Sequence, residues 1–223
     1  MQDFAATRVR GVVLDLWNTI AYNDHRPNPV VALGDAFGLR GQSGWTRIIE
    51  RGMMLERLAG IEAGIEALSR LTGNRLGPEQ SAELARIWRA ACARTRLFPE
   101  VPEILGRLAG RFRLGLLSNS QSFDLEFLDR PDLPFRARLF SFEMRALKPD
   151  PTLFLRMAEL LDLPPAGLLM VGDNLEDDVL GAEAATMQAF LLRRRDAPLS
   201  FQEVRPDRES LSSLDELADI LGV

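Results

Sequence analysis

The sequence has few of the side chains on which much enzyme chemistry depends. Its 223 residues include one histidine, His25, and one cysteine, Cys92. A Cys/His zinc site cannot be assembled from this pair, and a serine–histidine or cysteine–histidine pair would depend on His25 alone. A single cysteine permits no internal disulfide, so we expect a reducing, cytoplasmic compartment. We expect His25 to be solvated in a polar loop and Cys92 to be a packing residue.

Lysine is equally scarce. Of the 27 basic residues 26 are arginine, and the only lysine is Lys148. Retention of one lysine in such a chain suggests a site that needs a compact ammonium rather than a planar guanidinium. Chance retention is the alternative, and this residue alone does not decide between them.

Long apolar segments are absent as well. No run is long enough to span a bilayer and the N-terminus lacks a signal-peptide pattern, so we expect no membrane partner. The net charge of −5, from 32 acidic and 27 basic residues, is unlike the basic surface typical of nucleic-acid binding. With 46% hydrophobic and 26% charged residues, the composition is that of a globular protein with a substantial core. The oligomeric state is not indicated.

Strand-like and helix-like segments alternate after residue 97. The expected strands are 112–117, 137–142, 167–173 and one from 188, and the expected helices are 99–110, 122–129, 150–162, a segment ending near 185, and 213–221. Val9–Leu16 adds a strand at the start. Continuous apolar strands separated by helices indicate a parallel sheet covered on both faces. The pattern therefore predicts an α/β fold with a Rossmann-like, three-layer core.

Residues 23–96 are different, because they contain no convincing strand. Helical spacing appears at 45–58, at 61–71 and from Pro78. We expect an inserted all-helical domain over 23–96, with Trp45 and Trp88 in its core, and a core domain made of 1–22 and 97–223. The Arg193–Arg195 run is expected to be a solvated strand end.

Polar side chains follow several of the predicted strands where those strands end. Asp15 to Thr19 follow the first strand, Ser118–Asn119 the second, and Asp173 to Asp178 a third, while Lys148 precedes a helix. Ligands of open parallel sheets bind at this edge. A carboxylate nucleophile, a hydroxyl, an ammonium and acids that hold Mg²⁺ together predict a phosphoryl-transfer site.

These residues resemble the motifs of the haloacid dehalogenase superfamily of hydrolases, in their order along the chain. Asp15 with Thr19 resembles the first motif and Ser118 the second. Lys148-Pro149-Asp150-Pro151 resembles the third, and the segment VGDNLEDDVLGA from Val171 the fourth. The resemblance covers most of the chain. A helical cap inserted between the first and second motifs is one of the plans of that family.

The resemblance implies a role for each matching residue. Asp15 would be the nucleophile and a Mg²⁺ ligand, and Lys148 would organise nucleophile and phosphate. Ser118, Asn119 and Thr19 would bind phosphate. The remaining metal ligands would be Asp173, the backbone carbonyl of Trp17, and Asp178, with Asp177 as the fallback. Adjacent helical residues point about 100° apart, so both late acids cannot easily face one ion.

Trp17 departs from the pattern of the phosphatases in this family, which carry a second aspartate there as general acid. An indole N–H cannot donate a proton near neutral pH, and general acid–base catalysis contributes about 10²–10⁴ in rate. We expect a phosphatase acting on a small phosphorylated molecule that is slow, uses a good leaving group, or takes its proton elsewhere. One alternative is a 2-haloacid dehalogenase, whose leaving halide needs no proton. The other is a phosphate-ligand binding protein of weakened activity.

Overall fold

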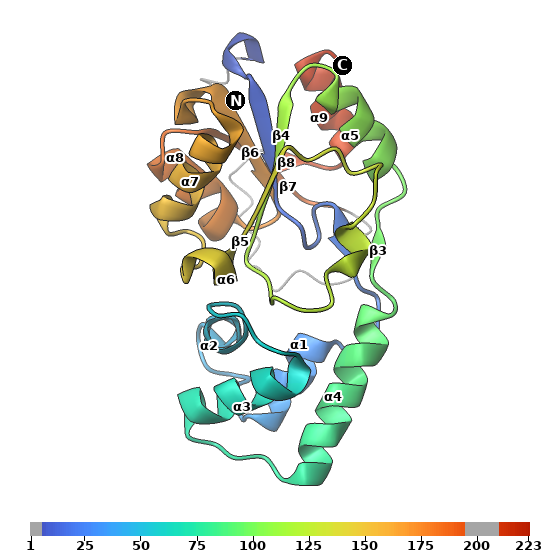
Figure 1. The fold of residues 1–223 in the computed structure, drawn as a ribbon, viewed down its shortest axis with the longest axis vertical. Helices are drawn as coiled ribbons and strands as arrows, with labels where there is room; N and C mark the ends of the chain where they lie inside the picture. The colour runs from blue at the N-terminus through green and yellow to red at the C-terminus, as the bar shows by residue number, and fades with distance from the viewer. Residues whose placement is uncertain (1–5, 195–209) are drawn as a thin grey trace.

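A six-stranded, wholly parallel sheet forms the centre of the larger of two units (Figure 1). The structure is a computed structural model and describes residues 6–194 and 210–223. The strand order is β5-β4-β1-β6-β7-β8. The bounds are β1 (Gly11–Leu14), β4 (Arg113–Ser118), β5 (Ala137–Phe140), β6 (Leu168–Gly172), β7 (Gln188–Leu192) and β8 (Ser210–Leu211). Because the chain runs outward from β1 in both directions, the edge beyond β1 is a topological switch point.

Helices cover both faces of this sheet. On one face α5 (Val101–Ala109) and α9 (Leu214–Leu221) share a hydrophobic cluster with the strands. On the other face α7 (Pro151–Leu161) and α8 (Gly181–Ala184) share a second cluster (Figure 1). The short elements are η1 (Ala6–Arg8), η2 (Glu126–Leu128), α6 (Ser141–Met144), η3 (Pro165–Gly167) and the π-helical turn η4 (Leu175–Leu180). The predicted α/β, three-layer core is confirmed.

The central strands are apolar throughout because helices cover both faces of the sheet. Every residue of β1 and of β6 is buried. A strand covered on both faces cannot alternate apolar and polar residues, so its sequence is a continuous apolar run. The first polar side chain after β1 therefore lies where the sheet ends.

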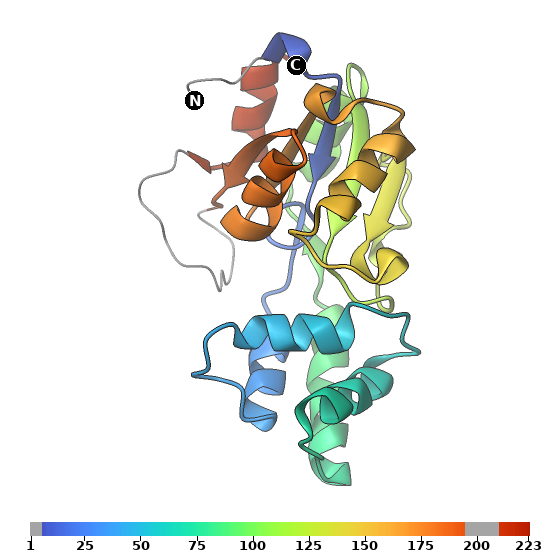
Figure 2. The ribbon, with the colours of Figure 1, turned by 90° about the vertical axis from the view of Figure 1, so that its left-hand side faces the viewer.

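The second unit is helical and lies beyond the edge at which the strands end (Figures 1 and 2). It consists of α1 (Pro29–Ala36), α2 (Trp45–Met53), α3 (Ile61–Thr72) and α4 (Pro78–Cys92). These helices bury their own hydrophobic cluster, in which Trp88 is buried and Trp45 is partly buried. The chain enters and leaves this unit through β2 (Ala21–Tyr22) and β3 (Arg96–Leu97), which pair with each other in antiparallel fashion. Within residues 6–194 and 210–223, no helix combines the length and apolar character that a membrane crossing requires.

The predicted helix over 122–129 is wrong, apart from the single turn η2. Asp124 has a left-handed backbone (φ +58°), which a continuous helix cannot contain. Its side chain accepts a hydrogen bond of 3.2 Å from the indole of Trp88 in the helical unit. The predicted strand over 137–142 ends at Phe140, because Ser141 begins α6. A tertiary contact thus replaces local helical structure at Asp124.

The expectation of a solvated run at Arg193–Arg195 is wrong for Arg194. Its side chain is 2% exposed and forms an ion pair with Glu100. Its Nε donates to the backbone oxygen of Thr19 at 2.9 Å, and its guanidinium lies 3.8 Å from the ring centroid of Phe98. These partners come from distant parts of the chain, which a local charge pattern does not contain. Arg195 lies outside the described residues.

Candidate active site

A buried ion pair stands at the carboxyl end of the central strand. Asp15 directly follows β1 and is 5% exposed, and Lys148 is 3% exposed. Lys148 Nζ donates to Asp15 Oδ1 at 2.7 Å and to the backbone oxygen of Leu117 at 3.3 Å. Burial by itself lowers the pKa of Lys148, but the charges of Asp15 and Asp178 outweigh this and hold the pKa above its usual value. The one lysine of the chain is therefore a fixed ammonium beside Asp15.

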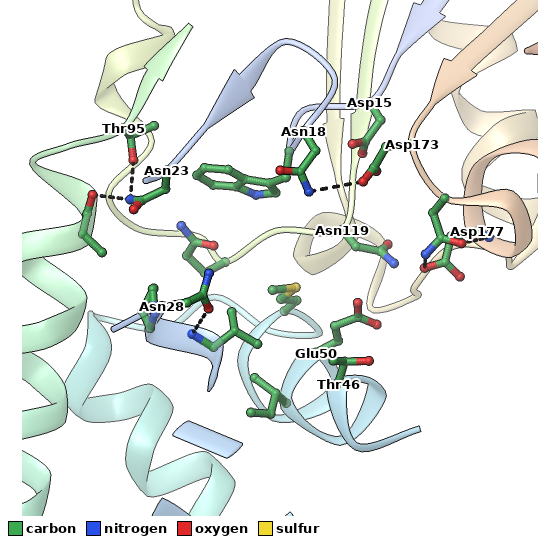
Figure 3. A pocket seen from close by; sticks show the side chains of 18 of the residues that line it. Asp15, Asn18, Asn23, Asn28, Thr46, Glu50, Thr95, Asn119, Asp173 and Asp177 are labelled. Carbon is green, nitrogen blue, oxygen red and sulfur yellow. Dashed lines mark hydrogen bonds between the residues drawn. The ribbon is translucent and has the colours of Figure 1, made fainter. Parts of the chain in front are cut away.

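Two further carboxylates complete a cluster around this pair. Asp15, Asp173 and Asp178 each offer an oxygen, and these three atoms all lie within 4.8 Å of one another. Lys148 Nζ also donates to Asp178, and Asn18 Nδ2 donates to Asp173 Oδ2 at 3.2 Å (Figure 3). Residues from three distant segments thus converge on one point beyond the sheet.

The pKa values of the cluster reflect its burial and the charges of its members. Burial raises the pKa of Asp15 to about 6, with Lys148 opposing the rise and Asp178 adding to it. Burial also raises the pKa of Asp173 well above its ordinary value, and the carboxylates of Asp15 and Asp178 raise it further. One ammonium does not neutralise three acids, so the cluster retains an affinity for positive charge.

The two adjacent acids of η4 point to different partners. Asp178 turns inward to Lys148, and its Oδ2 accepts from the backbone N–H of Asn174 at 2.9 Å. Asp177 instead forms an ion pair with Arg47 of α2, and Asn174 Nδ2 donates to its Oδ2 at 3.1 Å. Asn174 also caps η4 by accepting from the N–H groups of Glu176 and Asp177. The structure therefore brings Asp178, and not Asp177, into the carboxylate cluster.

Glycine at position 172 makes room for the inward acid. A Cβ at Gly172 would lie 2.2 Å from Asp178 Oδ2. No side chain larger than hydrogen fits between the end of β6 and that carboxylate. The pair Gly172-Asp173 thus ends the strand, supplies one acid and accommodates another.

The segment that carries Lys148 is held from both units. The amide of Asn119 accepts from the Lys148 backbone N–H at 2.8 Å and donates to the Lys148 carbonyl at 3.3 Å. Arg47 Nη1 donates to the same carbonyl at 2.9 Å. Asp150 then caps α7 by accepting from the N–H of Thr152. Asn119, predicted to bind phosphate, thus has a visible part in positioning Lys148.

A cavity of about 280 Å³ lies between the cluster and the helical unit. Figure 3 shows acids and amides of the core on one side and Glu50 and Thr46 of α2 on the other. Lining residues from the core include Asp15, Trp17, Asn18, Asn119, Lys148 and Asp173, and those from residues 23–95 include Asn28, Thr46, Ile49, Glu50, Trp88 and Cys92. The cluster gives the cavity its charged part, and Ile49 and Trp88 are among its apolar lining residues.

Several predicted residues lie outside the lining of this cavity. Thr19 is fully buried, and Ser118, also buried, donates its hydroxyl hydrogen to the Asn119 backbone oxygen at 3.3 Å. Their phosphate-binding roles stay predictions. The Nδ1 of His25 is 2.9 Å from the backbone oxygen of Pro27, and His25 does not line the cavity.

Trp17 and Cys92 line the cavity. Trp17 Nε1 donates to Ser120 Oγ at 3.3 Å, which turns the indole N–H toward a hydroxyl of the core. Metal binding by the Trp17 backbone carbonyl stays a prediction. Cys92 is partly buried at the edge of the helical core, and burial raises the pKa of its thiol to about 12. The cavity thus contains no reactive thiolate.

Arg47 and Glu50 were not identified from the sequence. They lie three residues apart on α2, with Arg47 Nη1 2.7 Å from Glu50 Oε2. Such i,i+3 pairs are common on solvated helix surfaces, so the spacing alone indicates nothing about a site. Only the position of α2 against the sheet edge brings them to the cavity.

The residues of the cluster fit a magnesium ion. Mg²⁺ prefers carboxylate oxygens and keeps further positions for water and substrate phosphate. Asp15, Asp173 and Asp178 provide such oxygens within a common reach. Burial first, and neighbouring carboxylates second, raise the pKa values of Asp15 and Asp173. A bound cation would favour the charged forms of both.

The chain matches known proteins over most of its length. A family model described as haloacid dehalogenase-like hydrolase matches residues 9–186. A haloacid dehalogenase-like hydrolase domain-containing protein of Arabidopsis thaliana is 26% identical over 227 aligned positions, which cover 96% of this chain and 86% of the relative. A phosphoserine phosphatase of Thermus thermophilus is 34% identical over 133 residues, which cover 58% of this chain and 52% of the relative.

Another relative shares only a segment. A haloacid dehalogenase-like hydrolase domain-containing protein 3 of Danio rerio is 32% identical over 77 residues, 34% of this chain and 31% of the relative. The chain thus spans about a third of one of these relatives, half of another and most of the third.

Solved structures share the fold at low identity. A phosphatase of this family from Thermococcus onnurineus has a TM-score of 0.63 at 21% identity, with 96% of this chain and 98% of that chain covered. A 2-haloacid dehalogenase from Pseudomonas syringae pv. Tomato has a TM-score of 0.60 at 21% identity and the same coverage. An enzyme of this family from Bacteroides thetaiotaomicron, in complex with magnesium and inorganic phosphate, has a TM-score of 0.58 at 15% identity, with 87% of this chain and 98% of that chain covered.

Proposed function

The chain belongs to the haloacid dehalogenase-like hydrolase family, and on that premise we propose that it is a magnesium-dependent phosphatase. Its substrate would be a small phosphorylated molecule bound in the cavity between sheet and helical unit. The observation that carries the proposal is the convergence of Asp15, Asp173, Asp178 and Lys148 at one end of that cavity.

Asp15 is the nucleophile in this proposal. It lies at the cavity surface, and the ammonium of Lys148 is 2.7 Å from its Oδ1. That contact fixes one carboxylate oxygen and leaves the other to attack phosphorus. Attack would give an aspartyl-phosphate, which water then hydrolyses to regenerate Asp15.

Lys148 and a metal ion in the carboxylate cluster would stabilise the negative charge of the substrate phosphate. The buried ammonium of Lys148 attracts a phosphate dianion and compensates the negative charge of Asp15. Magnesium, held by Asp15, Asp173 and Asp178, would supply electrostatic stabilisation to the phosphate oxygens. The positive charge of Lys148 remains in place throughout, because its pKa is held above the usual value.

The helical unit acts as a cap in this proposal. It supplies one wall of the cavity, and Arg47 connects it to the Lys148 and Asp177 segments of the core. Closure of such a wall excludes bulk water and provides contacts that select the substrate. A cavity of about 280 Å³ favours a metabolite over a macromolecule, and neither a nucleic acid nor a membrane is part of the proposal.

The dehalogenase alternative can be distinguished from the phosphatase by the product released and by its dependence on metal. Halide release from a 2-haloacid would need Asp15 as nucleophile but no added metal. We therefore assay phosphate release from phosphate monoesters and an acyl phosphate, and halide release from 2-haloacids, each with and without magnesium. Phosphate release that is lost with EDTA and in Asp15→Asn is the expected result.

Two results would count against this function. One is halide release without metal, which would identify a dehalogenase. The other is tight phosphate binding with no phosphate release and no phosphorylated Asp15, which would identify a binding protein. Intact-mass measurement after quenching in acid detects the aspartyl-phosphate directly.

A further inference from the structure

The proposed reaction lacks a proton donor at the position where one is expected. When Asp15 attacks phosphorus, the bond to the leaving oxygen breaks and that oxygen needs a proton. Trp17, two residues after Asp15, offers only an indole N–H, which donates to Ser120 Oγ. An indole does not release a proton near neutral pH. The inference below rests on the proposed phosphatase function and concerns where this proton originates.

The carboxyl groups that line the cavity are the possible sources of this proton. Asp15, Asp173 and Asp178 form the cluster. Both carboxylate oxygens of Asp177 are engaged, Oδ1 by Arg47 and Oδ2 by Asn174, whereas Glu50 is ion-paired with Arg47 through Oε2. Among the described residues that line the cavity, one carboxyl group remains, that of Glu50. It enters from α2, so it lies across the cavity from Asp15 (Figure 3).

Glu50 is held in place by the packing of its helix. Its neighbour Ile49 is buried in the helical core, as is Met53 one turn later. Arg47 of the same helix is hydrogen-bonded to the Lys148 carbonyl, which ties α2 to the core. The side chain of Glu50 is therefore directed to the cavity by a helix anchored on both sides.

The contacts of the Glu50 carboxyl group leave it available for proton transfer. Its Oε2 is 2.7 Å from Arg47 Nη1, but the alignment leaves this buried oxygen without a hydrogen bond from the described residues. The charged groups that act on it are Arg47 of its own helix, Asp177 of η4, and Lys148 and Asp15 of the core. Arg47 and Lys148 favour the carboxylate form of Glu50, whereas Asp177 and Asp15 favour the protonated form.

We propose that Glu50 is a catalytic residue that protonates the leaving group. As Asp15 attacks, the phosphorus–oxygen bond to the leaving group breaks, and the departing oxygen takes the proton of the Glu50 carboxyl. The products are the free alcohol, the aspartyl-phosphate and the Glu50 carboxylate. In the second step that carboxylate takes a proton from the water that attacks phosphorus, which releases phosphate and restores both Asp15 and Glu50.

The titration of Glu50 agrees with this assignment. Burial raises its pKa to about 7, although Arg47 opposes the rise. A general acid works best when its pKa lies near the working pH, since it is then both protonated and able to release its proton. A typical solvated glutamate, with a pKa of about 4.3, would be almost wholly ionised there.

The test uses substituted phenyl phosphates, which have similar size but different leaving groups. Glu50→Gln removes the proton and keeps the shape, so turnover of phenyl phosphate should fall by about 10²–10⁴ in kcat/KM. Turnover of p-nitrophenyl phosphate, whose leaving group needs little protonation, should fall by less than about tenfold. The control is Glu56→Gln, which removes an exposed acid from the same segment away from the cavity and should change neither rate.

A second variant guards against a merely structural effect. In Glu50→Ala, added imidazole should restore phenyl phosphate turnover, because imidazolium has a pKa near neutrality, as the histidine side chain does, and can donate the missing proton from the vacated space. Thermal unfolding of each variant checks that the fold is kept. Equal losses with the two esters, or full phenyl phosphate turnover in Glu50→Gln, would overturn the role of Glu50.

Failure of this inference is distinct from failure of the proposed function. Wild-type turnover of p-nitrophenyl phosphate that disappears in Asp15→Asn supports a phosphatase whatever Glu50 does. If the wild type turns over no ester or acyl phosphate, the proposed function itself is wrong, and the role of Glu50 falls with it.

Discussion

Arg47 of helix α2 donates a hydrogen bond of 2.9 Å to the backbone carbonyl of Lys148, the residue that also contacts Asp15. One guanidinium from the helical unit thus holds the segment that carries the ammonium of the site. The same guanidinium is ion-paired with Asp177. A movement of the helical unit away from the core would therefore also disturb the position of Lys148.

Removal of Arg47 should loosen this link. Hydrogen bonds that involve a charged group contribute about 1.5–3 kcal/mol, so Arg47→Ala should lower kcat/KM by roughly 10- to 100-fold. It should also increase the radius of gyration measured by small-angle X-ray scattering. Arg51→Ala is the matched control, because Arg51 is an exposed arginine at the end of the same helix. Equal effects of the two substitutions would contradict a specific role of Arg47.

The adjacent acids of η4 should differ in metal binding. Asp178 belongs to the carboxylate cluster, while Asp177 is paired with Arg47. Asp178→Asn should therefore weaken Mg²⁺ binding by an order of magnitude or more, whereas Asp177→Asn should have a small effect. Isothermal titration calorimetry with magnesium alone measures both. A larger loss in Asp177→Asn would reassign the ligand to the fallback residue.

Gly172 offers a test of how tightly the cluster is built. An alanine Cβ there would be 2.2 Å from Asp178 Oδ2, so Gly172→Ala must displace that carboxylate. We expect loss of Mg²⁺ binding and of phosphatase turnover. Gly106→Ala is the control, because a Cβ there meets no atom within 4 Å and the residue lies in helix α5. That substitution should stabilise the protein by about 0.5–1 kcal/mol in denaturant unfolding.

The elevated pKa of Glu50 predicts a pH dependence of stability. The pKa of Glu50 is about 7 in the folded state, raised by burial from its ordinary value of 4.5, which applies in the unfolded chain. Unfolding therefore releases this proton between those values, and stability relative to Glu50→Gln should decline as the pH rises through that window. Below pH 4.5 and above pH 7 the difference should level off. Denaturant unfolding of both proteins from pH 4 to 8 measures it, and a pH-independent difference would refute the raised pKa.

The sequence was sufficient to predict the core because its signals are local. Continuous apolar runs that end at Asp15, Ser118 and Asp173 can fit only a sheet covered on both faces, and parallel strands bring their ends together. The proximity of Asp15, Ser118 and Asp173 follows from that topology. Lys148 follows no predicted strand, and its match to the third motif of the family is what associated it with Asp15.

The features that the sequence did not indicate depend on contacts between segments that are far apart in the chain. Glu50 became a candidate only through the docking of α2, and Arg194 became buried only through Glu100 and Phe98. Asp124 interrupts an apparent helix because the indole of Trp88 binds it. Each case joins residues far apart in the chain, where neither periodicity nor charge pattern carries information.

The pairing of β2 with β3, where the chain enters and leaves the helical unit, determines which segment can be replaced by another. Tyr22 and Arg96 are partners in one antiparallel ladder, so the excursion between them begins and ends at nearly the same point. A segment with adjoining ends can be replaced by another of different length while β1 and its neighbours keep their register. Such a replacement would leave Asp15 in place but would remove Glu50. A different helical unit would therefore change which leaving alcohols can be protonated, as well as which substrates fit the cavity.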